Sequence, residues 1–459
     1  MTAAFQRAMD RINDPFRRGV FGRGIGLGRF SVMIVSLSSA TMLTNALGFP
    51  FWWLAARFFS PEAVGLSGAA ISAMSLLGSA SALGLGALLV RELPRHVGHE
   101  RHLIKSAAAA TLVSSLVLGL GFVVVSGVSG GDLAPLLQSP LAIVIFIGGV
   151  SAMGLSIIAD ASFMGLLRGE LNFGRNALMA FGKLVLLAVL GGLAGAGGVS
   201  AVSGSWMGIY SVWAVATLAS LLLMVALAGF LRILPRPSSD TPPSIIGFLP
   251  SAAGQFALNL TLQVPTLGMP ILAVTLGGAA AGAPFYIAWL LASMATIVPY
   301  SITSTLYAVG ARAPEALRRQ TQLTLVLSTA MAVAAVAGLF FLGGPLLSMF
   351  GSNYAGGGEL LTLLALTSLP TVIKNQFHVL LRIRDRLRFA VAACGAGAAV
   401  ELVAAYFGYQ AGGFIGLSIA WLAVVSVEAA AMAWTIPGLV SGGRWPSADE
   451  PVTDPGEAV

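Results

Sequence analysis

Residues 321–342 read TQLTLVLSTAMAVAAVAGLFFL, a run of 22 residues without a charged side chain. An α-helix of about 20 apolar residues crosses the hydrocarbon core of a bilayer, which is about 30 Å thick. Similar runs recur along the whole chain, which is 57% hydrophobic and only 9% charged. Soluble domains carry about 25% charged residues, and the strands of a membrane barrel would be about 10 residues long and alternating. The chain is therefore predicted to be an all-α polytopic membrane protein.

The apolar runs predict twelve membrane-spanning helices. Their ranges are 32–54, 63–90, 106–128, 140–166, 176–196, 202–230, 251–276, 282–308, 321–342, 360–381, 389–409 and 413–436. Orientation follows from Lys and Arg, because short cytoplasmic loops retain positive charge. Of the 25 Lys and Arg residues, 22 lie in the N-terminal segment, the C-terminal tail and every second loop. This alternation predicts that both termini are cytoplasmic.

A Pro- and Ser-rich segment near the middle of the chain divides the spans six from six. Transporters are often built from two such halves around a site near the bilayer midplane. We therefore expect two pseudo-symmetric six-helix lobes around a central cavity. The predicted parts are a basic amphipathic segment at 1–31, an N-lobe at 32–230, a cytoplasmic linker at 231–250, a C-lobe at 251–436 and a cytoplasmic tail at 437–459.

The span 282–308 carries a polar and aromatic stripe, because its polar residues recur at alternating steps of three and four. The stripe comprises Tyr286, Trp289, Ser293, Thr296, Tyr300, Thr303 and Tyr307. Hydrogen bonds between helices would also account for polar residues in spans. However, three tyrosines and a tryptophan are too bulky for close packing, and hydroxylated aromatic walls suit sugars. The stripe is expected to line a cavity, together with Asn259 and Gln263 of the preceding span.

Ionisable residues within the spans mark the other candidate positions. A charge at the bilayer centre costs about 2.5–3.5 kcal/mol, so each should face protein or water. Two interpretations stay open: structural ion pairs, with Asp160 on Lys183 and Lys374 on Glu401 or Glu428, or roles in binding substrate or ions. At the outer end of the first span, Arg57 is either a snorkelling anchor or a further binding cation.

Several classes of function are disfavoured by what the sequence lacks. The expected external loops are short, and they hold no paired carboxylates, Ser/His/Asp set or Walker loop, so an enzyme is not expected. The single cysteine, Cys394, rules out a disulfide framework. His96, His99 and His102 lie in a basic loop that is expected to be solvated, and neither a metal nor a cofactor is predicted.

Three stretches resemble the polysaccharide-transporter branch of the multidrug/oligosaccharidyl-lipid/polysaccharide flippase superfamily. The first, 45–95, contains the turn SPEAVG between the first two spans. The second, 284–311, begins PFYIAWLLASMATIVPY, and the third, 345–389, contains FGSNYAGG followed by a Leu-rich helix ending in Leu-Arg. Taken with the twelve expected spans, the resemblance covers nearly the whole chain.

The resemblance implies a flippase that moves polyprenyl-phosphate-linked oligosaccharide, or a related glycolipid, from the inner to the outer leaflet by alternating access. It implies a bacterial inner-membrane location and a role in surface polysaccharide export, with polysaccharide polymerase or glycosyltransferases as partners and no nucleic acid. A multidrug or cation antiporter of the sister branch is the alternative.

The resemblance also implies roles for individual residues. Cavity cations of the family receive the pyrophosphate, for which the candidates here are Arg57, Lys183 and Lys374. The tyrosines at 286, 300 and 307 would lie against the sugar. The expected proton or ion carriers are Asp160, Glu401 and Glu428.

Overall fold

The computed structural model describes residues 47–96, 98–129, 139–195, 205–231, 249–310 and 317–441, and these residues are helical apart from short connections. The predicted all-α membrane fold is confirmed. The predicted amphipathic segment at 1–31, most of the first span, most of the linker and the tail beyond residue 441 lie outside the described residues.

The helices of the N-lobe follow the predicted spans. They are α3 (Gly48–Phe58), α4 (Pro61–Ser81), α5 (Leu85–Glu92), α6 (Glu100–Ser129), α7 (Pro140–Gly165), α8 (Gly169–Gly195) and α9 (Trp206–Phe230). A Ser-Pro pair starts both α4 and α7, where the serine side chain accepts a hydrogen bond from the backbone three residues later. The second span is broken between α4 and α5, where Leu83 and Gly84 take left-handed backbone angles.

The C-lobe comprises longer helices. They are α10 (Leu249–Gly277), α11 (Ala279–Gly310), α12 (Leu317–Phe350), α13 (Ser352–Ala355), α14 (Gly358–Leu366), α15 (Ser368–Ile383) and α16 (Leu387–Ser441). The backbone of α16 is non-helical at Gly412 and Gly413, which splits it into the two last predicted spans. On either side of this reversal, Gly408 and Gly416 pack backbone against backbone, so tightly that a β-carbon on either would clash with the carbonyl oxygen of the other.

Nine of the described helices are long and apolar enough to cross a membrane. One of them is α16, which holds two spans. With α14 and α15 together forming one more and α3 ending the first, the described helices correspond to the twelve predicted spans.

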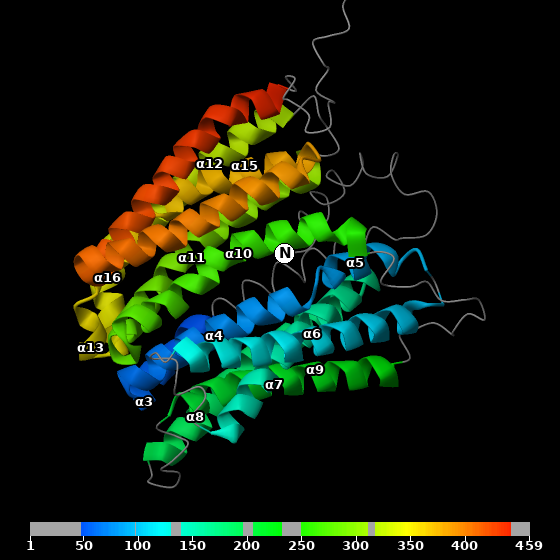
Figure 1. The fold of residues 1–459 in the computed structure, drawn as a ribbon, viewed down its shortest axis with the longest axis horizontal. Helices are drawn as coiled ribbons and strands as arrows, with labels where there is room; N and C mark the ends of the chain where they lie inside the picture. Colours follow the sequence, from blue (N-terminus) through cyan, green and yellow to red (C-terminus); the bar gives the residue numbers. More distant parts are fainter. Residues whose placement is uncertain are drawn as a thin grey trace, which may run out of the picture.

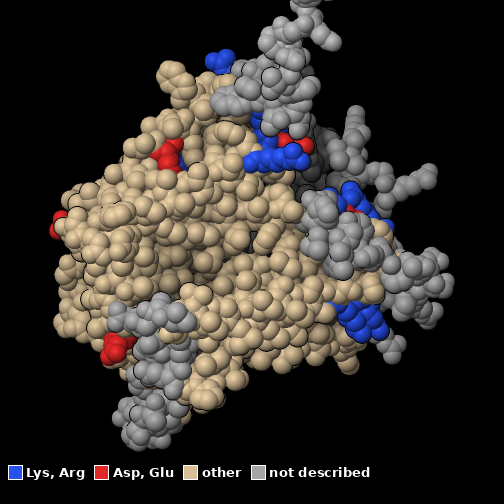
Figure 2. Space-filling model, viewed as in Figure 1, with Lys and Arg blue, Asp and Glu red and all other residues tan. Residues whose placement is uncertain are grey.

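Figure 1 shows α4 to α9 in one bundle and α11, α12, α15 and α16 in another, with α10 between them. The two bundles converge where α3 and α13 lie, which we call the α13 end. Lys and Arg gather toward the opposite end, as Figure 2 shows for one face of the molecule. We call that opposite end the basic end.

The apolar cores show where the lobes touch. One large core joins both lobes in the half nearest the α13 end, with members from α3, α4 and α7 and from α10, α11 and α12. In the half nearest the basic end, a core formed by α5, α6 and α7 belongs to the N-lobe alone. The core formed by α10, α12, α15 and α16 belongs to the C-lobe alone. The lobes therefore share a core at one end and keep separate cores at the other.

Candidate functional site

A cavity of about 510 Å³ lies within the C-lobe, between α10, α11, α15 and both halves of α16. Its α15 residues run from Thr371 to Arg382, toward the Ile383 end of the helix, which places the cavity in the half nearest the basic end. Small-molecule sites commonly measure about 300–1,000 Å³. Its polar lining includes Asn259, Gln263, Thr296, Tyr300, Lys374, Asn375, His378, Arg382, Glu401, Trp421 and Glu428.

A buried ion cluster forms one side of this cavity. Lys374 Nζ lies 2.5 Å from Glu401 Oε1 and 2.5 Å from Glu428 Oε2. The indole Nε1–H of Trp421 donates to Glu401 Oε2 at 2.6 Å. The reversal at Gly412 and Gly413 is what brings the two glutamates, one from each half of α16, to the same lysine. The predicted pairing of Lys374 is confirmed, and it involves both candidate partners at once.

Two of the predicted binding residues, Asn259 and Gln263, line the same cavity from α10, as expected. Arg382 Nη2 donates to Asn259 Oδ1 at 2.6 Å, which fixes that amide across from α15. The sequence did not single out Arg382, which lies just beyond the predicted span 360–381, or His378, which is a histidine inside that span.

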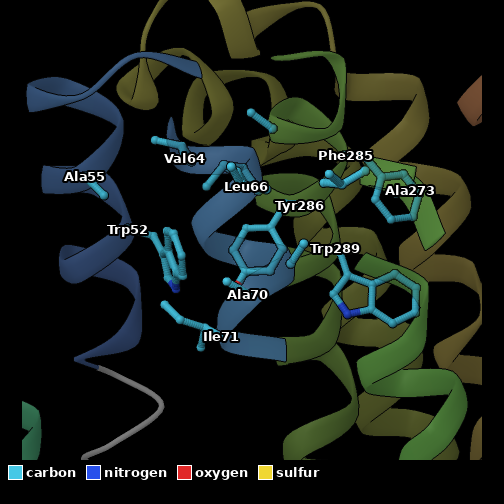
Figure 3. Close-up of a cluster of buried hydrophobic side chains, with 14 of the residues drawn as sticks. Trp52, Ala55, Val64, Leu66, Ala70, Ile71, Ala273, Phe285, Tyr286 and Trp289 are labelled. Carbon is cyan, nitrogen blue, oxygen red and sulfur yellow. The ribbon is translucent and has the colours of Figure 1, made fainter. Parts of the chain in front are cut away.

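The structure divides the predicted stripe of α11 between two environments. Thr296, Tyr300 and Thr303 line the cavity. Tyr286 does not line it: its ring packs 4.6 Å from that of Trp52 and is 7% exposed, in the core shared by the lobes (Figure 3). The prediction of one continuous cavity-lining stripe is therefore wrong for this conformation, because α11 is long enough to cross both regions. The side chain of Tyr307 lies outside those that the structure describes.

Asp160 pairs with Arg175, which corrects the predicted pairing with Lys183. The guanidinium of Arg175 makes a two-pronged ion pair, with Nε donating to Asp160 Oδ1 at 2.5 Å and Nη2 donating to Oδ2. Arg175 had been placed in a loop, whereas α8 already begins at Gly169 and presents it in its second turn. A planar fork that matches a carboxylate is the preferred geometry for such a pair.

Lys183 is left in an aromatic slot of the N-lobe. Its Nζ lies 3.8 Å from the ring centroid of Trp213 and 5.3 Å from that of Phe51, and the residue is 1% exposed. Among the residues that the structure describes, no carboxylate forms an ion pair with it. Ring faces attract a cation, and they do so more strongly when water is excluded.

Arg57 lies at the α13 end and is not among the residues that line the cavity. Its Nε donates to the carbonyl of Met349 at 3.2 Å, and its guanidinium lies 5.6 Å from the ring centroid of Trp53. The indole of Trp53 donates to the same carbonyl at 2.9 Å. The two side chains together fasten α3 to the end of α12.

Comparisons with known proteins reveal the fold. No family model matches the chain, and no curated protein matches it in sequence. Among solved structures, an inward-facing multidrug resistance MATE family transporter of the MOP superfamily aligns with a TM-score of 0.60, at 17% identity over 89% of this chain and 98% of that one. A MATE structure in complex with MaL6 scores 0.61, at 14% identity over 89% and 96%.

The chain has the MATE fold. An outward-facing MATE transporter aligns equally well, with a TM-score of 0.60 at 14% identity over 91% of this chain and 99% of that one. The fold therefore fits both conformations, and the packing of this chain distinguishes between them. Because the lobes share a core only at the α13 end, the MATE fold is here closed at that end.

Proposed function

We propose that this protein is a membrane transporter that flips a lipid-linked oligosaccharide, or a related glycolipid, from the inner to the outer leaflet by alternating access. The observation that carries the proposal is the polar cavity of the C-lobe, placed in the half where the lobes have separate cores. Basic ends are cytoplasmic by the positive-inside rule. The cavity would then accept its cargo from the cytoplasmic side of an inner membrane.

The composition of the cavity favours a glycan over an organic cation. Both of its carboxylates already contact Lys374, so neither is free to neutralise a cationic drug. Amides, hydroxyls, a tyrosine and a tryptophan provide hydrogen bonds and flat surfaces, which are the groups that a sugar uses. In the N-lobe, Lys183 would receive the phosphate of the carrier once the aromatic slot opens. In the C-lobe, Glu401 and Glu428 would carry protons or ions.

A second candidate is a multidrug or cation antiporter. It is favoured by the fold comparison, since the structures that share the fold include proteins described as multidrug resistance transporters. The two proposals differ in what they require of the cavity. An antiporter needs a carboxylate that is released from Lys374 in order to bind its cationic cargo, whereas a glycan can bind while Lys374 still contacts both carboxylates.

Deletion of the gene tests the proposal in its host. The flippase proposal predicts loss of surface polysaccharide and accumulation of lipid-linked repeat units on the inner side, with drug susceptibility unchanged. Complementation with the native chain should restore the polysaccharide, as should Lys105→Met, which changes an exposed lysine outside the cavity. Lys374→Met should not restore it. A deletion strain that retains its surface polysaccharide but becomes sensitive to cationic drugs would establish the antiporter instead.

A further inference from the structure

The charges around the C-lobe cavity balance. Lys374 and Arg382 carry two positive charges, and Glu401 and Glu428 carry two negative ones. Both oxygens of Glu401 are engaged, one by Lys374 and one by the indole of Trp421. Lys374 is already paired with both carboxylates, and a neutral molecule can enter the cavity without disturbing these ion pairs.

Several buried polar atoms belonging to residues that line the same cavity have no hydrogen-bond partner among the residues that the structure describes. They are both ring nitrogens of His378, Nε of Arg382 and Oε1 of Glu428. His378 is 5% exposed, so its ring is shielded from bulk solvent. Buried polar groups are almost always paired, and a group left unpaired requires an explanation such as a bound molecule.

The unpaired atoms demand both donors and acceptors from whatever occupies the cavity. A neutral imidazole offers one donor and one acceptor, the guanidinium Nε–H donates, and the carboxylate oxygen accepts. A phosphate provides only acceptors for this set unless it is protonated, and an ammonium provides only donors. A hydroxyl provides both, so a molecule with several hydroxyls can satisfy all of these atoms together.

The remaining wall is aromatic and rigid. Trp421 lines the cavity, and its ring lies 4.8 Å from that of Trp289, centroid to centroid. The bond from its Nε1 to Glu401 holds the indole in place. Tyr300 of α11 contributes a second aromatic group to the lining. Flat apolar surfaces beside hydrogen-bonding groups match a sugar ring, which has apolar C–H faces and a hydroxylated rim.

We propose that the C-lobe cavity is a subsite for one neutral pyranose ring, whose hydroxyls are bound by His378, Arg382 and Glu428. The inference rests on the proposed function and deepens it, because it assigns the sugar to the C-lobe and makes these residues determinants of specificity. The carrier phosphate is excluded from this subsite and is bound elsewhere.

Binding of simple sugars to the full chain tests the subsite directly. The protein is placed in phospholipid nanodiscs free of sugar-based detergent. Methyl glycosides of glucose, galactose, mannose and N-acetylglucosamine are then titrated, with saturation-transfer NMR as the readout. At least one glycoside is expected to bind saturably, and neither inorganic phosphate nor tetraphenylphosphonium should displace it.

Variants at His378 separate recognition from folding. His378→Leu is expected to weaken binding at least tenfold, whereas His378→Gln, which keeps one donor and one acceptor, should stay within about threefold of the native chain. Ser426→Ala is the matched control on α16, because Ser426 is exposed and its hydroxyl bonds only to its own helix. Equal thermal unfolding of the variants shows that each is folded.

Each outcome of these titrations decides the proposal. It is overturned if no glycoside binds, if tetraphenylphosphonium or phosphate displaces the glycoside, or if His378→Leu binds as well as the native chain, which would leave adventitious binding only. Failure here is distinct from failure of the flippase proposal. If the deletion strain loses surface polysaccharide but no glycoside binds to the protein, the subsite proposal is refuted and the flippase proposal still holds.

Discussion

The ring of Tyr286 on α11 packs directly onto the backbone of Gly68 on α4, where a β-carbon would lie 2.7 Å from Cγ of the ring. One turn earlier, a β-carbon on Gly65 would lie 2.0 Å from the carbonyl oxygen of Ala279. These glycines let two helices of different lobes approach closely, which is the usual role of small residues between membrane helices. They close the α13 end.

Gly68→Ala is therefore predicted to open the α13 end. Overpacking costs about 1–3 kcal/mol, which corresponds to a roughly 5–150-fold shift in a two-state equilibrium. Spin labels at Glu62 and Ser348, both exposed near this end, would report a longer distance between the lobes in the variant. Cys394 is first replaced by Ser. Gly121→Ala is the control, because a β-carbon there meets nothing within 4 Å. An unchanged distance distribution in Gly68→Ala would refute the gating role.

Lys374→Met is predicted to destabilise the C-lobe strongly, because it leaves two carboxylates facing each other without their cation. Removing one partner of a buried ion pair costs about 3–5 kcal/mol. Thermal unfolding of the purified protein measures the loss, with Lys105→Met as the exposed control. Adding Glu401→Gln and Glu428→Gln to Lys374→Met should recover most of the stability. If the triple variant is as unstable as the single one, the lysine acts through packing rather than charge.

Asp160 is predicted to be structural rather than a proton carrier. Asp160→Asn and Arg175→Gln should each lower stability, and the double variant should lose much less than the sum of the two. The same double variant should still restore surface polysaccharide in the deletion strain. Loss of transport in a stable double variant would instead show that Asp160 takes part in proton or ion coupling.

Lys183→Met is predicted to separate stability from function. The cation interacts with two rings, worth about 2 kcal/mol at a desolvated site, yet a buried charge without a carboxylate partner is itself costly. We expect the melting temperature to stay the same or rise, while transport is lost. Trp213→Leu should lower stability without restoring transport. Polysaccharide export at the native level in Lys183→Met would show that the lysine does not bind the carrier phosphate.

Local features of the sequence predicted the secondary structure well. The lengths of the apolar runs and the Ser-Pro starts of α4 and α7 are local properties, and the helices follow them closely. Charge placement also identified the basic end, because an arginine at a helix end must stay near water whatever its neighbours are. The pairing of Lys374 with Glu401 or Glu428 was one of the two interpretations that the ionisable residues within the spans left open, and the structure pairs it with both.

The sequence did not predict which side chains of a helix would face a cavity, or which residues of distant helices would pair. Helical periodicity placed Tyr286 and Tyr300 on one face, but contacts with α3 and α4 bury the first, whereas the second lines a cavity. Likewise, depth alone allowed Asp160 to pair with Lys183, while the actual start of α8 brings Arg175 to it.

The sequence by itself determined that lipid is the solvent of this protein, that its chain crosses the membrane in apolar helices, and that one end is basic. These follow from the free energy of moving single side chains between water and hydrocarbon, which depends on each residue alone. The tertiary structure decided which charges neutralise each other, where the lobes close and where a polar cavity remains. Those outcomes depend on distances between helices far apart in sequence, and no local pattern encodes them.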